Sequence, residues 1–340
     1  MATPQPVLDS PAGSEFRDDV RRRQPLPPDV LKRLTTLDDK QAWRAAGLNL
    51  LAVAIILIPG SRALESLWLL PFVWLLMALA QQALFVLAHD AAHYRLFSSR
   101  ALNDGVGRAV ASVVGISMCS YRVVHRLHHN DLYGKTDPDT PLHGGYPRGR
   151  RYLFKKLARD LTGVTAPKTY GYFFGAPAIK TSADTQAQPL DDTSPALRAA
   201  ARADRWWVVG FQLLAPVAAY AFGILTEYLV LWVLPLLTVL QAVLRLRAIM
   251  EHGAVTDYSS PLTAARTNLG PRWLMAVLFP HYVHYHVEHH LYPAIPHYHL
   301  RECHEELEAR GWLQAAEVKA IGDTFTRVCA DPACSFACEH

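Results

Sequence analysis

Four long segments without a charged side chain constrain this 340-residue chain more than any other feature. They contain no Asp, Glu, Lys or Arg and cover residues 45–61, 67–88, 206–226 and 228–244. Uncharged runs of about 17–25 residues match the hydrocarbon core of a bilayer. The pattern therefore predicts an integral membrane protein, and it excludes an ordinary soluble globule and a β-barrel.

We predict an all-α fold in which four transmembrane helices carry a cytoplasmic helical cap. The crossings are expected at about residues 45–61, 64–88, 206–226 and 228–248. Pro59–Gly60 is expected to mark a tight turn between the first two. Residues 109–121 are also uncharged but too few to span, so an interfacial or re-entrant segment is expected there.

The predicted domain organisation follows from these segments. Residues 1–44 form a cytoplasmic N-terminal segment, residues 45–310 the membrane domain, and residues 311–340 a cytoplasmic tail. Within the membrane domain, residues 181–194 have the composition of a loop.

The distribution of positive charge predicts the orientation in the membrane. The segment before the first apolar run carries Arg21, Arg22, Arg23, Lys32, Arg33 and Arg44. The two short links offer only Arg62. By the positive-inside rule, the N-terminus, the long polar middle and the C-terminus are cytoplasmic. With a net charge of only +4, the basic N-terminus is interpreted as a topology signal, and no nucleic-acid partner is expected.

Histidine placement is the most informative feature for function, because many of the sixteen histidines fall in three clusters. The clusters are His89 and His93; His125, His128 and His129; and His286, His289 and His290. Residues at i, i+3 and i+4 share one face of a helix, so each cluster presents several imidazoles in one direction. Neutral imidazole is a good ligand for iron, copper, zinc and nickel.

His252 joins these clusters because the fourth crossing emerges with it on the cytoplasmic side. Nine histidines exceed what one ion with an open position can use, so two metal ions are predicted. Iron is the best candidate, although the spacing also fits copper or zinc. His281 and His284 are candidates for orienting the ligands. The remaining histidines are interpreted as solvated or core side chains, and they are His143, His297, His299, His304 and His340.

Other metal and nucleophile motifs are absent from the sequence. It contains no His-Glu-x-x-His, no Glu-x-x-His and no Gly-x-Ser-x-Gly. The five cysteines form no Cys-x2-Cys pair. The last three are interpreted as part of a terminal tail, and they are Cys329, Cys334 and Cys338. Two redox-active ions in an all-histidine shell at a membrane surface point to oxygen activation for attack on a lipid C–H bond.

The three clusters resemble the histidine boxes of the membrane fatty acid desaturase family. The matching segments are residues 89–93, 125–129 and 285–293, with Asn103-Asp104 and Asp137-Pro138-Asp139 as neighbours of the first two. The resemblance covers about residues 84–306. Two positions depart from the family pattern: His284 and Ala248 stand where relatives often have asparagine.

The resemblance implies two irons (Fe2+/Fe3+) bound by all nine histidines, with His252 as the additional ligand. It also implies dioxygen as oxidant, a membrane lipid or acyl substrate, and electrons from a separate ferredoxin or small cytochrome. No catalytic residue beyond the metal ligands is implied.

Three functions remain open at this point. The first is an acyl-lipid desaturase, an oxidoreductase of lipid and fatty acid metabolism. The second is a hydroxylase or ketolase of carotenoids or other lipids, which shares the boxes. The third is a metal-binding transporter, which the few polar residues of the crossings disfavour.

The topology itself is testable. Reporter fusions after Gly60 and Glu227 are expected to lie outside, and fusions after Arg205 and at His340 inside, because the cations flank the inner ends. The readout is the activity of a compartment-specific reporter. A C-terminus found outside would place the histidine clusters on opposite sides of the membrane and contradict the prediction.

Overall fold

The protein is described by a computed structural model that covers residues 25–134, 137–174, 195–255 and 257–332. The expectations for residues 1–24 and 181–194, and for Cys334, Cys338 and His340, lie outside the described residues. The chain divides into two compact units. Unit 1 comprises Met1–Thr36, Arg126–Lys155 and Arg245–His340, and unit 2 comprises Leu37–His125 and Lys156–Leu244.

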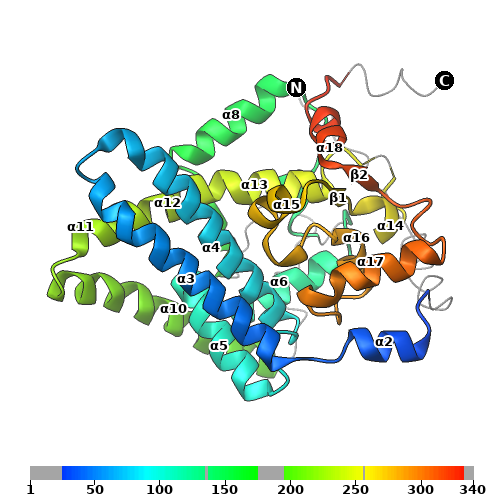
Figure 1. The fold of residues 1–340 in the computed structure, drawn as a ribbon, viewed down its shortest axis with the longest axis horizontal. Helices are drawn as coiled ribbons and strands as arrows, with labels where there is room; N and C mark the ends of the chain where they lie inside the picture. The colour runs from blue at the N-terminus through cyan, green and yellow to red at the C-terminus, as the bar shows by residue number, and fades with distance from the viewer. Residues whose placement is uncertain (1–24, 135–136, 175–194, 256, 333–340) are drawn as a thin grey trace. The chain divides into compact units, whose positions relative to one another are not determined.

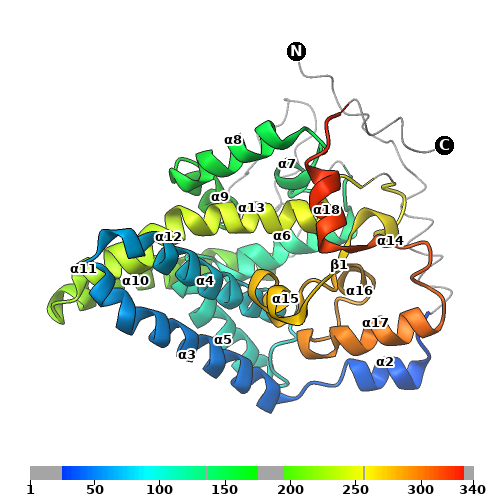
Figure 2. The ribbon, with the colours of Figure 1, turned by 45° about the horizontal axis from the view of Figure 1, so that its top comes forward.

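Unit 2 is built around two long apolar helices. Helix α3 (Asp39–Ala63) packs along α4 (Leu70–Ala92), which follows the short 3-10 helix η1 (Leu67–Leu69). Helix α5 (Arg100–Val113) packs against both α4 and α10 (Pro195–Ala221) (Figures 1 and 2). The shorter helices are α9 (Ala166–Phe173), α11 (Leu225–Glu227), the π-helix η2 (Tyr228–Val233) and α12 (Leu234–Leu237).

Three helices pass from one unit into the other. They are α6 (Met118–Asn130), α8 (Arg150–Leu161) and α13 (Val239–His252). The remaining helices belong to unit 1: α2 (Pro28–Leu34), α7 (Thr140–His143), α14 (Pro261–Ala264), α15 (Arg272–Leu278), η3 (Pro280–Tyr282), α16 (His286–Leu291), η4 (His297–His299), α17 (Leu300–Ala309) and α18 (Ile321–Val328).

The structure is mostly helical, as predicted, but unit 1 also contains a small parallel sheet. Strands β1 (Thr267–Leu269) and β2 (Val318–Ala320) pair in register, with Thr267 opposite Val318. An all-α fold is therefore not quite right. Strands this short carry too few residues to display the alternation by which strands are recognised in a sequence.

Three helical segments of the described chain are long and apolar enough to cross a membrane. They cover Asp39–Ala63, Leu67–Ala92 and Leu225–His252, which match the expected first, second and fourth crossings. The expected third crossing falls largely in α10, which begins with a charged stretch at Pro195 and ends at Ala221. Helix α10 is not among the three segments, so the four-crossing arrangement stays a prediction.

The expected turn at Pro59–Gly60 is wrong, because α3 continues through both residues to Ala63. Gly60 has a packing role instead. A Cβ atom on Gly60 would lie 3.2 Å from the Val73 side chain and 3.3 Å from Leu231. The absence of a side chain thus allows close approach of neighbouring helices, a common use of small residues in membrane proteins. The 109–121 segment is likewise divided between the end of α5 and the start of α6.

The polar residues of the apolar helices bind backbone carbonyl groups. Gln81 donates to the Trp232 carbonyl at 2.8 Å, and Gln241 donates to the Leu236 carbonyl at 2.8 Å. Gln212 on α10 donates to the Ser112 carbonyl at 2.8 Å. These contacts link or brace helices, as expected for amides in an apolar environment.

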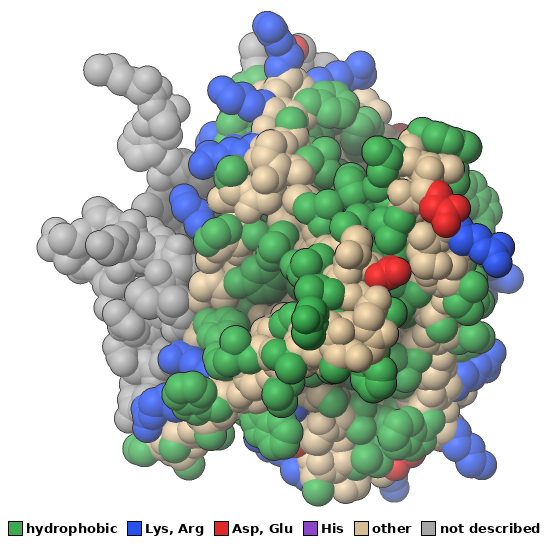
Figure 3. Space-filling view, turned by 90° about the vertical axis from the view of Figure 1, so that its left-hand side faces the viewer, with side chains coloured by type: hydrophobic (Ala, Val, Ile, Leu, Met, Phe, Trp, Pro, Cys, Tyr) green, Lys and Arg blue, Asp and Glu red, His purple; other side chains and the backbone are tan. Residues whose placement is uncertain are grey.

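Large apolar side chains cover the outer faces of these helices. The surface on the side where α11 lies is mostly apolar, with few charged groups (Figure 3). Trp68, Trp206 and Phe222 are each more than 70% exposed. Such a surface fits contact with lipid.

Asp204 on α10 anchors the start of α6. Its carboxylate accepts hydrogen bonds from Arg108 at 2.7 Å and from the Ser117 hydroxyl and the Cys119 N–H at 3.0 Å. The carboxylate thereby satisfies an N–H group at the beginning of the helix that carries the second histidine cluster.

Replacing Asp204→Ala is expected to destabilise the protein by about 2–4 kcal/mol, because it leaves a guanidinium and a helix end without their acceptor. The measurement is thermal unfolding of the purified protein in detergent. Asp323→Ala, at an exposed carboxylate in α18, should change stability by less than about 0.5 kcal/mol. Equal melting temperatures for the two variants would contradict the assigned role of Asp204.

Candidate metal centre

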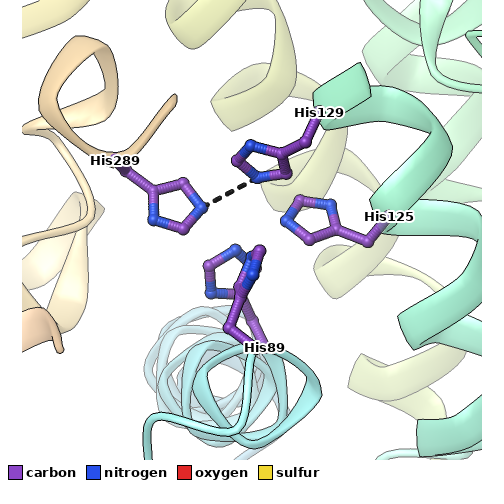
Figure 4. A group of neighbouring side chains, drawn as sticks. His89, His125, His129 and His289 are labelled. Carbon is purple, nitrogen blue, oxygen red and sulfur yellow. Dashed lines mark hydrogen bonds between the residues drawn. The ribbon is translucent and has the colours of Figure 1, made fainter. Parts of the chain in front are cut away.

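Unit 2 brings three of the predicted histidines together. His89 lies in the last turn of α4, His93 caps that helix, and His125 lies on α6. Their ring centroids are 4.5–4.9 Å apart, and their ligand nitrogens lie within 4.8 Å of one another. Figure 4 shows His89 on α4 and His125 on α6. This arrangement lets three imidazoles from two helices bind one ion.

A buried arginine holds the end of α4 in place. Arg122 on α6 donates to the carbonyl oxygens of Ala92 at 2.9 Å and Ala91 at 3.1 Å, and to Asp104 at 2.9 Å. Asn103 on α5 also donates to the Ala91 carbonyl at 3.0 Å. The last carbonyl groups of a helix have no partner within the helix. Satisfying them here fixes the turn that carries His89.

Unit 1 brings together four histidines from three helices. Their ligand nitrogens lie within 4.8 Å of one another, and they are His128, His252, His286 and His290. The Nε2 atom of His286 is 2.8 Å from that of His252 and 3.2 Å from that of His290. Two nitrogens bound at right angles to one ion, each about 2.1 Å from it, would be about 3 Å apart. The donor set and its spacing therefore fit a metal ion.

A further pair in unit 1 shows the same spacing. The Nε2 atoms of His129 and His289 are 3.0 Å apart and face each other (Figure 4). His129 lies one helical turn after His125 on α6, so the two side chains share a face of that helix. Unit 1 thus brings together six of the nine predicted ligands.

A second buried arginine holds the end of α13, whose last residue is His252. Arg266 is fully buried and donates to the Gly253 carbonyl at 2.8 Å and to Glu317 at 3.2 Å. Its backbone N–H donates to the Glu251 carbonyl at 2.7 Å. The guanidinium of Arg266 therefore holds the helix end that carries His252.

Burial lowers the pKa of several of the imidazoles and so favours their neutral form. It lowers the pKa of His286 and His290 well below the ordinary value of 6.5, and neighbouring imidazoles lower both further. Burial and the neighbouring His89 lower the pKa of His93 in the same way. A neutral imidazole has the lone pair that a metal needs, so these side chains are ready to bind an ion at pH 7.

His128 is different because it faces carboxylates. Burial acts to lower its pKa, but the charges of Asp137 and Asp139 and a hydrogen bond to Asp137 raise it to about 9. The His128 Nδ1 to Asp137 Oδ1 distance is 2.9 Å. A metal ion held by Nε2 would take the place of a proton there, and Nδ1–H would donate to Asp137.

The structure also places groups that the sequence did not identify. His143, taken from the sequence as a solvated or core side chain, is buried with its ring centroid 4.7 Å from that of His252. Asp137 was recognised only as a neighbour of the second cluster. The sequence contains one feature that could have indicated both His143 and Asp137. Both lie shortly after the second cluster in the chain, in or just beyond the Asp-Pro-Asp segment that leads into α7.

Other polar residues brace the third cluster from outside. Glu288, buried in α16, accepts from the Thr267 hydroxyl at 2.6 Å and binds His304 Nδ1 at 2.5 Å. His284 packs against Tyr285, and His281 contacts His297. Unlike Asp137, Glu288 thus holds groups outside the nine predicted ligands.

The chain belongs to the fatty acid desaturase family, whose model matches residues 66–316. It is 25% identical to a dihydrorhizobitoxine desaturase of Bradyrhizobium elkanii, over 68% of this chain and 65% of that protein. It is 28% identical to a probable fatty acid desaturase of Sorghum bicolor, over 78% and 70% of the two chains. It is 31% identical to a chloroplastic sn-2 acyl-lipid omega-3 desaturase (ferredoxin) of Helianthus annuus, over 31% of this chain and 24% of that protein.

Membership of this family confirms the resemblance inferred from the boxes and implies an oxidoreductase. The chain spans about two thirds of the length of the first two relatives. Its apolar helices fit the membrane association expected of this family.

Asp137→Asn is expected to lower the affinity for metal about 10–100-fold, because the amide cannot hold the His128 tautomer as the carboxylate does. The measurement is competition with a chelator of known affinity. Asp160→Asn changes another buried carboxylate, which accepts from Thr165, and should leave metal affinity unchanged. Unaltered affinity in Asp137→Asn would show that His128 needs no orientation by Asp137.

Proposed function

We propose that this protein is an oxygen-dependent acyl-lipid desaturase that introduces a double bond into a fatty acyl chain. The observation that carries the proposal is the convergence of imidazole nitrogens at 2.8–3.2 Å in a chain of the desaturase family. One ring nitrogen of a neutral imidazole either donates or accepts a single hydrogen bond, so Nε2 of His286 can bond only one of its two neighbours, His252 and His290. A bound ion could instead hold all three nitrogens.

The nine histidines would hold two iron ions. His128, His252, His286 and His290 would bind one of the two ions, because their ligand nitrogens lie within 4.8 Å of one another in unit 1. Bound iron would supply activation of dioxygen for removal of hydrogen from an unactivated CH2 group.

The chain's own residues position the substrate and exclude water. In unit 2, the ring of Tyr121 stacks on His125 with centroids 5.1 Å apart and packs against Phe85 and Phe173. These buried aromatic side chains give the histidine cluster an apolar wall. An acyl chain lying against this wall would present CH2 groups rather than polar groups to the ligands.

We place the centre on the cytoplasmic side of a membrane that the chain crosses four times. α10 would supply the third crossing, in addition to the three apolar segments that match the first, second and fourth. The cations that precede the first crossing support this orientation. Both termini would then be cytoplasmic.

The electron donor would be a separate ferredoxin or small cytochrome. A relative named as ferredoxin-type supports a ferredoxin, and the substrate would be a membrane lipid. Transport of metal is disfavoured, because Gln81, Gln212 and Gln241 bind backbone carbonyl groups between the helices.

The proposal is tested by lipid analysis of cells that express the protein with and without a supply of carotenoids. A new unsaturated acyl chain that appears in both cultures, and is absent with His289→Ala, is expected. An oxygenated carotenoid or a hydroxylated acyl chain without a new double bond would instead assign the protein to the hydroxylases or ketolases.

The nine ligands are expected to act as one unit. Purified protein should contain about two irons per chain, since nine imidazoles exceed the needs of one ion. His89→Ala, His128→Ala, His289→Ala and His252→Ala should each abolish product, and double variants should be no worse than single ones. Elemental analysis and product assays provide the measurement.

His297→Ala is the matched control, because His297 is a buried histidine that contacts His281 rather than the clusters. It should retain both iron and activity. Full turnover and unchanged iron in His252→Ala would reduce the ligand set to eight, and one zinc without iron in the wild type would contradict the di-iron assignment.

A further inference from the structure

His143 is a buried histidine that the nine-ligand centre leaves without a role. It is the last residue of α7, and only 1% of its surface is exposed. Its ring packs against Tyr133 and His252, with centroids 4.8 and 4.7 Å away. Neither of its ring nitrogens has a hydrogen-bond partner. Buried polar atoms are normally satisfied, so this ring is arranged to meet a group from outside the chain.

The neighbours of His143 identify that group as a cation. Ligand atoms of His143, Asp137 and His128 all lie within 4.8 Å of one another. Asp137 is held in place by the backbone N–H groups of Tyr133 and Asp139, at 2.8 and 2.9 Å. Two imidazoles and one carboxylate suit a divalent first-row transition metal. We call these three residues the triad.

His128 belongs both to the triad and to the four-histidine group. A neutral imidazole has a single lone pair, so His128 can bind only one of two neighbouring ions at a time. With an ion on Nε2, Nδ1–H of His128 would donate to Asp137, whose Oδ1 lies 2.9 Å away. The triad can therefore use His128 only while the four-histidine group is empty.

We propose that the triad is a loading site, which first takes a divalent transition-metal ion and then passes it to the four-histidine group. In the triad the ion is bound by Nδ1 of His128, and Nε2 carries the proton. On transfer the ion moves to Nε2 and the proton to Nδ1, so neither charge nor protons are lost. The inference rests on the proposed metal centre but not on the reaction that the centre performs.

The test measures uptake of Co2+ by the full-length metal-free protein in detergent. Cobalt absorbance gives the rate, and elemental analysis gives the final content. His143→Phe keeps a ring against Tyr133 and His252 but removes the ligand atoms. It should load at least tenfold more slowly than wild type and reach the same final content. His143→Cys, which restores a ligand, should recover part of the rate, and His297→Phe should load like wild type.

Each other outcome decides against the proposal. Loading of His143→Phe at the wild-type rate would remove His143 from the route. A lower final cobalt content would make His143 a permanent ligand instead. His143→Gln, a smaller change that also lacks a ring nitrogen, should repeat the slow loading if His143→Phe does not fold. Failure of the wild type to bind any cobalt would contradict the metal centre itself, whereas normal binding with unchanged loading would contradict only the triad.

Discussion

Two buried arginines fix the helix ends on which the histidine clusters depend. Arg122 binds carbonyl groups at the end of α4, and Arg266 binds those at the end of α13. Both helices are apolar segments of the kind that crosses a membrane, and both end at or beside a predicted ligand. A helix end without partners frays, and a ligand on a frayed turn cannot hold a fixed direction. Because a guanidinium offers several donors in one plane, a single side chain satisfies more than one carbonyl.

The cost of burying these cations is met locally. Arg122 pairs with Asp104 at 2.9 Å, and Arg266 pairs with Glu317 at 3.2 Å. Asp104 and Glu317 both lie outside the histidine clusters, so neither ion pair uses a carboxylate that contacts a predicted ligand. Burial, together with the neighbouring imidazoles, lowers the pKa of His286 and His290 and favours their neutral form, which is the form that binds metal.

The sequence predicted those parts of the structure that depend on local geometry. The spacing of His125 and His129 predicts that they share one face of a helix, and both residues lie on α6. The turn predicted at Pro59–Gly60 was wrong because a glycine favours both turns and close helix contacts, and the sequence alone does not distinguish them. Here Gly60 allows close contact with Val73 and Leu231. The position of His143 beside the predicted ligands was missed because the role of an isolated histidine depends on the residues that the fold brings next to it. Its contact with His252 joins residues that are distant in the chain.

Two buried acidic residues beside the histidine clusters, Glu288 and Asp137, act in different ways. Glu288 directs its charge to His304, where its hydrogen bond and charge outweigh burial and raise the pKa of that imidazole. Asp137 directs its charge to His128, which is itself a predicted ligand. An ion on the four-histidine group would therefore lie near carboxylates that are outside the predicted ligand set. Asp137 and Asp139 are 2.9 and 3.6 Å from Nδ1 of His128, and Glu251 is 3.9 Å from Nε2 of His286.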